Sequence, residues 1–592
     1  NTTGANNTAV GYRALTSNQT NDNNTAVGTD ALKNTVADAN TAVGHNAMNV
    51  NSTGAYNVAV GAFALDANTT GNYNAALGSS SLTNNTTGTL NTAVGQSALF
   101  SNTTASNNTA VGYNALNANT TGIDATAVGS GALASNTTAN NNTAIGKDSL
   151  NANTTGHSNV GLGKQSLRVN TTGDNNTSVG SFTLYANTTG GSNTALGRSA
   201  LEGNTTASNN TALGYFSLKY NTTGANNTAV GGESLEANTT ASDNTALGFR
   251  ALTANTTGVE NTAVGANALD ANTTATGGAA FGKGTLTTNT TGEENTALGT
   301  SSMQQNSTGA YNTAVGSQAL KANTTADNNT SVGYKSLFTN TTGGGNTAVG
   351  RYAMYSNTTA STNTAIGYNA LYANTTGTQN TAIGAYALDA ITTASTCTAV
   401  GYQALTANTA GNNAAFGSTA MATNTTGTGN CAFGHAALVT TQTGDQNSAF
   451  GYAALYNSNG TSANTAVGGY SGHNITTGGY NVLLGYYAGV NITTGIKNVV
   501  VGQNTLRTLT TGSYNTALGD QALYDYTGSE TVSIGHASSY ELTTGTQCTA
   551  VGTSAYRNAT TGDYNTAIGY YTMGAAVVTG GHNTAVGYRA AQ

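Results

Sequence analysis

One feature constrains this chain more than any other: a 17-residue repeat that continues from one end to the other. Glycines that close an Ala-Val-Gly-like tripeptide occur 35 times between Gly11 and Gly587. Thirty of the 34 intervals between them are 17 residues long, three are 16 and one is 18. A fixed short period indicates a solenoid, in which each repeat adds one structural unit. We therefore expect a single continuous repeat domain over residues 1–592.

Two apolar positions of the repeat are candidates for the core. Counted from its first Asn, the consensus is N-T-A-V-G-x-x-A-L-x-x-N-T-T-G-x-x, and we call the residues that share one position a column. Column 4 holds Val, Ile, Leu or Phe in all 35 copies, and column 9 holds Leu in 25 and Met in five. No charged residue occupies either column, so both are predicted to point inward. Column 9 has five exceptions, which predict less regular packing from about residue 468: Gly472, Gly489, Ser539, Tyr556 and Ala591.

The spacing of these columns favours strands over helices. Positions 4 and 9 would lie on opposite sides of a helix, whereas β-branched residues and Asn-Thr-Thr-Gly segments are typical of short strands and turns. The sequence predicts an all-β solenoid, or β-roll, of about 35 stacked rungs. Each rung would have two short strands, at positions 1–5 and 7–11, and a return turn whose position-15 Gly can take positive φ. Ala139, Ala207 and Ala241 replace that Gly, so the turn does not need positive φ in every rung.

Stacking would place identical residues above one another. A spacing of about 4.8 Å per rung gives a rod roughly 170 Å long. Asn ladders, paired amide to amide, would account for a chain that is rich in Asn and poor in charge, because stacked like charges repel. With Val of column 4 inside, alternation along the strand turns Ala of columns 3 and 8 outward, as an apolar stripe for lateral association. Phe416, Phe433 and Phe450 share column 4 and are predicted to form a buried aromatic ladder.

The composition excludes several classes of protein. Charged residues are only 7% of the chain, and the net charge of −7 is spread without basic runs, so nucleic-acid binding is not expected. No stretch approaches 18 consecutive apolar residues, so no membrane span is expected. Cys397, Cys431 and Cys548 are far apart and fit neither a disulfide framework nor a metal site.

The repeat resembles two groups of surface proteins. Thr-Ala-Val-Gly followed by x-x-Ala-Leu is similar to the Val-Ala-Ile-Gly-x-x-Ser repeats in the heads of trimeric autotransporter adhesins. The Asn-Thr-Ala-Val/Ile-Gly, Ala-Leu and Asn-Thr-Thr-Gly segments resemble still more the repeats of phage and bacterial tail-fibre-like proteins. The resemblance covers the whole chain, although the period is longer than in the adhesin heads. It implies a β-roll, commonly a homo-trimer, on the surface of a cell or virion.

No catalytic, cofactor-binding or metal-binding residues are predicted. The six histidines are scattered, as are the acidic residues, and the glycines follow the period. Tyrosines recur in columns 6, 10 and 17, where they either pack over the turns or form a sugar-binding surface. Asn-x-Thr sequons, such as those at Asn1, Asn107 and Asn119, follow from the repeat itself. The histidines are His45, His157, His435, His473, His536 and His582.

These observations favour a structural extracellular fibre, filament or adhesive stalk without catalytic activity. The alternatives are an ice-binding or a glycan-binding solenoid. Ice binding is disfavoured at this point, because Thr of column 2 would point inward with column 4 and Thr of columns 13 and 14 lies in a turn. End-to-end stacking is also an expectation, since a junction between Gln592 and the next Asn1 would space the anchor glycines by 16 residues. The alternative is that the chain was cut from a longer run of repeats.

Overall fold

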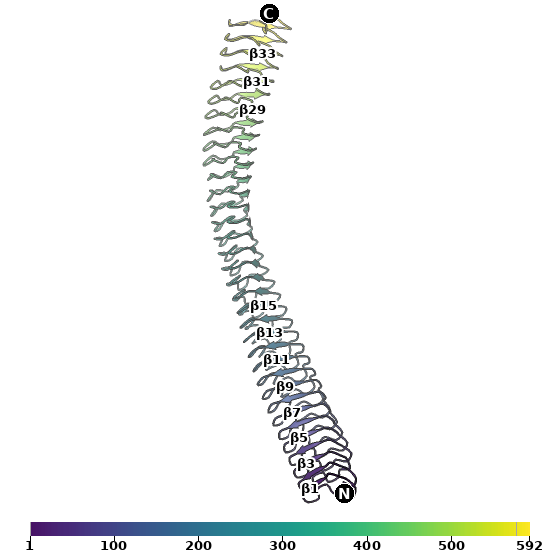
Figure 1. Cartoon of the computed structure of the whole chain (residues 1–592). Helices are drawn as coiled ribbons and strands as arrows, with labels where there is room; N and C mark the ends of the chain where they lie inside the picture. Colours follow the sequence, from purple (N-terminus) through teal and green to yellow (C-terminus); the bar gives the residue numbers. More distant parts are fainter. Residues whose placement is uncertain (1, 576, 592) are drawn as a thin grey trace. The chain divides into compact units, whose positions relative to one another are not determined.

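The computed structural model describes residues 2–575 and 577–591, and in these it contains strands but no helix. Each of the 35 strands covers positions 2–4 of one rung. Within residues 2–295 and within residues 296–591, consecutive strands pair in parallel with residues of the same column opposite each other, as Ala110 of β7 (Thr109–Val111) does with Ala127 of β8 (Thr126–Val128). Successive rungs therefore stack in register (Figure 1), which confirms the all-β solenoid with 17-residue rungs.

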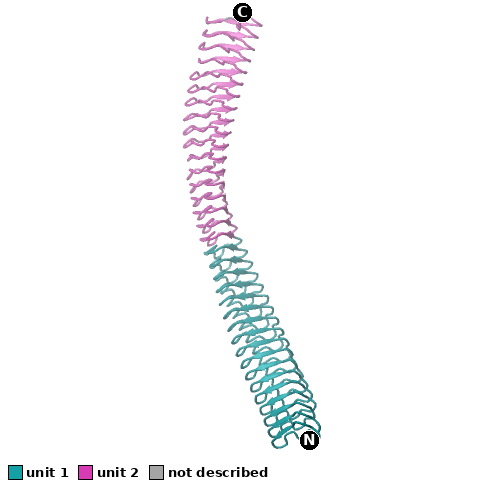
Figure 2. Cartoon of the chain, viewed as in Figure 1, with its two compact units in different colours: residues 1–295 teal, residues 296–592 magenta. Residues whose placement is uncertain are grey.

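The chain divides into two compact units, residues 1–295 and 296–592, and each is a stack of the same rungs (Figure 2). The strands of the first unit are β1 (Thr8–Val10), β2 (Thr25–Val27), β3 (Thr41–Val43), β4 (Val58–Val60), β5 (Ala75–Leu77), β6 (Thr92–Val94), β7 (Thr109–Val111), β8 (Thr126–Val128), β9 (Thr143–Ile145), β10 (Val160–Leu162), β11 (Thr177–Val179), β12 (Thr194–Leu196), β13 (Thr211–Leu213), β14 (Thr228–Val230), β15 (Thr245–Leu247), β16 (Thr262–Val264) and β17 (Ala279–Phe281). The strands of the second unit are β18 (Thr296–Leu298), β19 (Thr313–Val315), β20 (Thr330–Val332), β21 (Thr347–Val349), β22 (Thr364–Ile366), β23 (Thr381–Ile383), β24 (Thr398–Val400), β25 (Ala414–Phe416), β26 (Cys431–Phe433), β27 (Ser448–Phe450), β28 (Thr465–Val467), β29 (Val482–Leu484), β30 (Val499–Val501), β31 (Thr516–Leu518), β32 (Val532–Ile534), β33 (Thr549–Val551), β34 (Thr566–Ile568) and β35 (Thr584–Val586).

The second strand predicted at positions 7–11 does not form in the described rungs, where this segment is a series of turns. In one central rung Asn114 and Leu116 have φ of 53° and 51°, in the left-handed region, which interrupts an extended conformation. The segment nevertheless bonds to its neighbour: the N–H groups of Leu116 and Ala118 donate to the carbonyls of Ala132 and Ala134, both at 2.9 Å. Each rung is thus one short strand and one bent coil, and both are hydrogen-bonded to the adjacent rung.

Left-handed backbone explains which residues the repeat tolerates. Positive φ recurs at positions 7, 9 and 17, and Asn and Asp, which tolerate it, are frequent at 7 and 17. Position 9 is apolar in every rung except that of Ser539 and is left-handed throughout the described rungs, and it contains no Val, Ile or Thr. The sequence had suggested positive φ for the glycine at position 15, but the structure places it at position 5. The position-5 glycines have φ between 127° and 142°. A Cβ at Gly163 would also lie 2.5 Å from the carbonyl oxygen of Gly180.

The inward and outward faces of the strand are the reverse of those predicted. In 34 of the 35 strands the middle residue is buried and its two neighbours are not, so Ala of column 3 faces the core and column 4 faces solvent. Gly161 shows what column 3 faces, since a Cβ there would lie 3.3 Å from Leu150 of column 9. The large column 9 side chains fill the narrow interior, and only small residues fit opposite them. The buried columns are 1, 3, 8, 9, 12 and 15.

The phenylalanine ladder forms, but its predicted burial is wrong. Phe416 and Phe433 stack with ring centroids 4.3 Å apart, and Phe433 and Phe450 with centroids 5.2 Å apart. Phe433 and Phe450 are each 38% exposed. The three rings belong to the outward column 4, so stacking between rungs aligns them on the outer surface of the sheet.

Two asparagine ladders tie the rungs together, as predicted, but both are buried, which the sequence did not indicate. In column 12, Nδ2 of Asn119 donates to Oδ1 of Asn102 in the preceding rung (3.1 Å) and to the carbonyl of Gly122 in its own rung (2.9 Å). In column 1, the backbone N–H of Asn108 donates to Oδ1 of Asn91 (3.0 Å), and Nδ2 of Asn108 reaches the same Gly122 carbonyl (2.9 Å). The ladders thus satisfy buried side-chain amides and a turn carbonyl together.

Where column 9 loses its large residue, other columns refill the core. Gly472 and Gly489 keep the left-handed conformation, with φ of 57° and 55°. A Cβ at Gly472 would lie 2.6 Å from Leu483, which replaces the usual Ala of column 3, and 3.1 Å from Ile475, which replaces the usual Asn of column 12. Both of these apolar side chains are buried. Interior volume is therefore conserved by exchange between columns.

Substitutions at Leu133 test the left-handed backbone of column 9. Leu133→Met and Leu133→Ile remove little volume, but the β-branched Ile is more strained than Met at a φ of 49°. We expect Ile to cost about 1–3 kcal/mol more than Met. Hydrogen exchange measured by mass spectrometry over residues 108–158 should show faster exchange in the Ile variant and unchanged exchange in distant rungs. Equal exchange in the two variants would contradict the assigned conformation.

An interruption of the column 12 ladder offers a stabilising substitution. Ile391 occupies this column, and Oδ1 of Asn374 in the preceding rung is buried without a hydrogen-bond partner. Ile391→Asn should supply that donor and stabilise the local rungs by about 1 kcal/mol, seen as slower amide exchange. Ile475→Asn is the matched control, and it should destabilise, because Ile475 fills the space beside Gly472. Destabilisation by both substitutions would contradict the ladder.

Candidate binding surfaces

The described residues contain no group of three or more His, Cys, Asp or Glu side chains arranged to hold a metal ion. Across these same residues, no helix is long and apolar enough to cross a membrane. Candidate function therefore has to be sought on the outer surface of the rungs. Two surfaces differ from the remainder: the outer side of the sheet and an aromatic groove on the bent coil.

We call columns 2 and 4 the sheet face. Column 2 is Thr in six consecutive rungs of the first unit, Thr177, Thr194, Thr211, Thr228, Thr245 and Thr262. Their hydroxyls make no hydrogen bond within the described chain, unlike the column 13 hydroxyl of Thr103, which donates to the carbonyl of Thr120 (3.1 Å). The Thr side chains of column 2 thus point outward, which removes the reason for which ice binding was disfavoured.

The predicted alanine stripe is absent, and a larger apolar stripe takes its place. Ala110 and Ala115, in columns 3 and 8, are both fully buried. Column 4 is partly or well exposed in every described strand, for example at Ile145 (41%), Leu196 (48%) and Leu247 (45%). Neither column 2 nor column 4 contains a charged residue. The sheet face is therefore a continuous uncharged surface within each unit.

The three free cysteines can show experimentally which columns face solvent and which face the core. Cys431 lies in column 2 and is partly exposed, whereas Cys397 and Cys548 lie in the buried column 1. Burial raises the pKa of the Cys397 and Cys548 thiols, because desolvation disfavours the thiolate, which is the reactive form.

Alkylation with N-ethylmaleimide should therefore modify Cys431 first. Burial also raises the pKa of the Cys431 thiol, so all three reactions should accelerate as the pH rises. Peptide mass spectrometry of a time course gives the order, and the unfolded chain in denaturant, where the three rates should converge, is the control. Faster modification of Cys397 or Cys548 than of Cys431 would show that column 2 faces inward.

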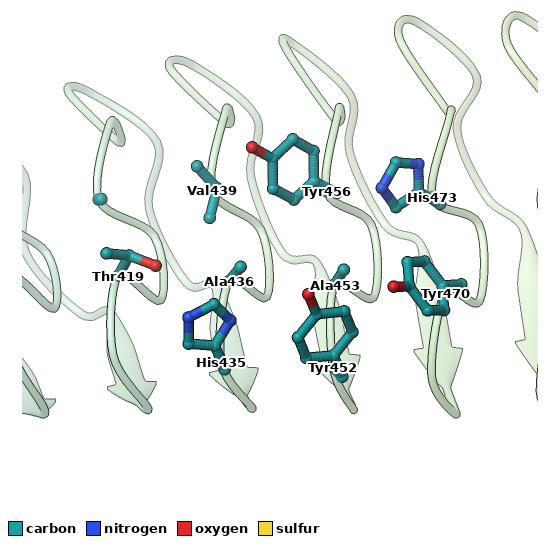
Figure 3. Close-up of a pocket in the computed structure, with 10 residues that line it drawn as sticks. Thr419, His435, Ala436, Val439, Tyr452, Ala453, Tyr456, Tyr470 and His473 are labelled. Atoms are coloured by element: carbon teal, nitrogen blue, oxygen red, sulfur yellow. The ribbon is translucent and has the colours of Figure 1, made fainter.

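The second surface, the aromatic groove, lies on the bent coil of the second unit and has a volume of about 580 Å³ (Figure 3). One wall is formed by column 6, the other by column 10, and the floor by column 7. Its lining residues are Thr419, Ala422, His435, Ala436, Val439, Tyr452, Ala453, Tyr456, Tyr470 and His473.

Ring stacking between rungs builds both walls of the groove. His435 stacks on Tyr452 with centroids 5.4 Å apart, and Tyr456 stacks on His473 at 5.0 Å. Tyr470 stands at one end, edge-on to Tyr452 (5.1 Å) and tilted against His473 (5.5 Å). In that rung column 6 is a glycine, which leaves space for the Tyr470 ring. The groove is thus closed at this end and bounded laterally by aromatic rings.

The structure brings His435 and His473 to one groove and keeps the other histidines apart. His45 packs edge-on against Phe63 (5.3 Å), and His582 stacks on Tyr564 (4.7 Å). The groove was not predicted from the sequence, because residues of a single column do not reveal it. The signal was the juxtaposition of two aromatic columns, 6 and 10, across neighbouring rungs.

The tyrosines of column 6 are exposed, as Tyr113 (55%) and Tyr402 (50%) show. In column 17, Tyr56 and Tyr73 stack on each other at 5.1 Å. Of the sequons, Asn119 is buried in the column 12 ladder. Asn107 is exposed, and Asn1 lies outside the described residues.

No protein-family model matches the chain, and a search of curated proteins finds no significant match. The similarity to adhesin heads and tail-fibre-like proteins therefore rests on the repeat motif alone.

Proposed function

We propose that this protein is a structural extracellular fibre or adhesive stalk, displayed on a cell or virion surface and without catalytic activity. The described rungs repeat one hydrogen-bonding pattern, and such a repeat extends a stack without shaping an enclosed active site. The resemblance of the repeat to adhesin heads and tail-fibre-like proteins supports the same role.

We further propose that the sheet face joins copies of the chain laterally into a homo-trimer. The observation that carries this proposal is the exposed apolar column 4, which continues through each unit without a charged residue in it or in column 2. Long exposed apolar surfaces are typical of interfaces, and an uncharged one can be buried without leaving an unpaired charge. The number of copies follows from the resemblance to trimeric adhesins.

Lysines on the sheet face should abolish lateral association. Leu196→Lys, Leu213→Lys and Leu247→Lys together place three charges in the interface, where burial is costly. Light scattering after size exclusion should give three chain masses for the parent protein and one for this variant. The matched control replaces exposed column 14 residues of the same rungs, Thr206, Thr223 and Thr257, by Lys and should remain trimeric. A monomeric parent protein would refute lateral association.

Ice binding is a second candidate, favoured by the outward threonines of column 2 with their unbonded hydroxyls. Thr of column 2 and the apolar residue of column 4 lie on the same side of each strand and in register from rung to rung, which forms a regular array of hydroxyl and methyl groups. The same face cannot be buried between copies and also contact ice. Thermal hysteresis from a monomeric parent protein, lost in the sheet-face lysine variant, would favour ice binding. A trimer without thermal hysteresis favours the fibre.

A further inference from the structure

We propose that the aromatic groove is a binding site for a neutral carbohydrate chain. This inference rests on the adhesive role proposed above and assigns it a ligand class and a location. Pyranose rings would pack their C–H faces against the aromatic walls, while tyrosine hydroxyls and histidine Nε2 atoms bond to sugar hydroxyls. Nδ1 of His473 is already hydrogen-bonded to Oδ1 of Asn474 (2.9 Å).

The dimensions of the groove suit an elongated ligand of small cross-section. Its volume of about 580 Å³ lies within the range of small-molecule sites, roughly 300–1,000 Å³. The lining residues come from four consecutive rungs, between Thr419 and His473, and rungs are spaced by about 4.8 Å. The groove therefore follows the stacking direction and accommodates several consecutive units of a linear chain.

The walls and floor have complementary chemistry. Ala436 and Ala453 give a smooth apolar floor, and Tyr452 is 51% exposed beside it. The hydroxyl of Tyr456 makes no hydrogen bond within the described chain and is available to a ligand. Aromatic side chains with a polar tip suit ligands that combine apolar faces with hydroxyl groups.

The absence of carboxylates, lysines and arginines from the lining selects a neutral ligand. A second aromatic stretch of the same unit provides the contrast. There Arg351 lies 4.8 Å from the ring centroid of Tyr352 and 5.9 Å from those of Tyr334 and Tyr368, so the protein's own cation occupies the aromatic surface. No cation–π contact of this kind involves the rings of the groove among the described residues.

The test uses the full chain and a panel of neutral hexasaccharides: cellohexaose, maltohexaose, mannohexaose and chitohexaose. Hexagalacturonate is the acidic counter-probe. Isothermal titration calorimetry and saturation-transfer NMR measure binding, and we expect at least one neutral hexasaccharide to bind and the acidic one to bind more weakly. Tyr452→Ala and Tyr456→Ala should each weaken that binding by about two- to tenfold, and the double variant by more.

Two controls separate ring contacts from general effects. Tyr452→Phe retains the ring and should keep most of the affinity. Tyr113→Ala removes an exposed column 6 tyrosine from the other unit and should change nothing. Circular dichroism checks that each variant remains folded.

Three results would overturn the inference: no neutral hexasaccharide binds, hexagalacturonate alone binds, or binding persists in the double variant. Light scattering and negative-stain images of the same samples report on the fibre separately. Fibres that bind no sugar would retain the proposed function and refute only the groove. Sugar binding by a chain that forms no assembly would support the groove as a binding site and refute the proposed fibre.

Discussion

Every residue of this fold must tolerate a near-copy of itself about 4.8 Å away on each side. In-register parallel pairing imposes this constraint, and it acts on polar, apolar and aromatic groups alike. Buried amides satisfy it because each is both donor and acceptor, as Asn102 and Asn119 show. Exposed rings satisfy it by stacking, as Phe416, Phe433 and Phe450 do. Like charges repel at this spacing, which accounts for the low charge content of the chain.

The same constraint determines how a rung turns without a second strand. Residues at positions 7 and 9 enter the left-handed region, at a cost of roughly 1–2 kcal/mol for each non-Gly residue. The N–H of Leu116 and that of Ala118 still reach carbonyls of the next rung, so the bend remains hydrogen-bonded to its neighbour. Burial of Leu116 in the same segment adds apolar stabilisation that offsets the conformational cost.

The periodicity was sufficient to predict the solenoid, the length of the rung and the asparagine ladders. It was insufficient for the register of the strand, because an apolar column was assumed to be an inward one. Column 4 is apolar and outward, since Val and Ile suit the strand backbone itself. Column 9 contained an unused clue: a buried column without any β-branched residue points to positive φ. Burial of Ala110 beside Leu116 follows from interior volume, which periodicity does not report.

The candidate surfaces were only partly predictable. The tyrosine columns indicated aromatic edges, and the sheet face follows once the register is corrected. The groove depended on a three-dimensional coincidence that single columns do not reveal. His435 and Tyr452 form one wall and Tyr456 and His473 the other because positions 6 and 10 flank a floor of alanines at position 7. Tyr470 closes the end because its own rung has glycine at position 6.

The column 12 ladder also has a direction. Each Nδ2 donates to the preceding rung and each Oδ1 accepts from the following one, as in the series Asn85, Asn102, Asn119. The amide dipoles therefore add along the stack, and each polarises the next. Ile391 interrupts the series, and the group left unpaired is the oxygen of Asn374, on the lower-numbered side. A stack of these rungs is thus electrically polar, and its two ends are chemically unequal.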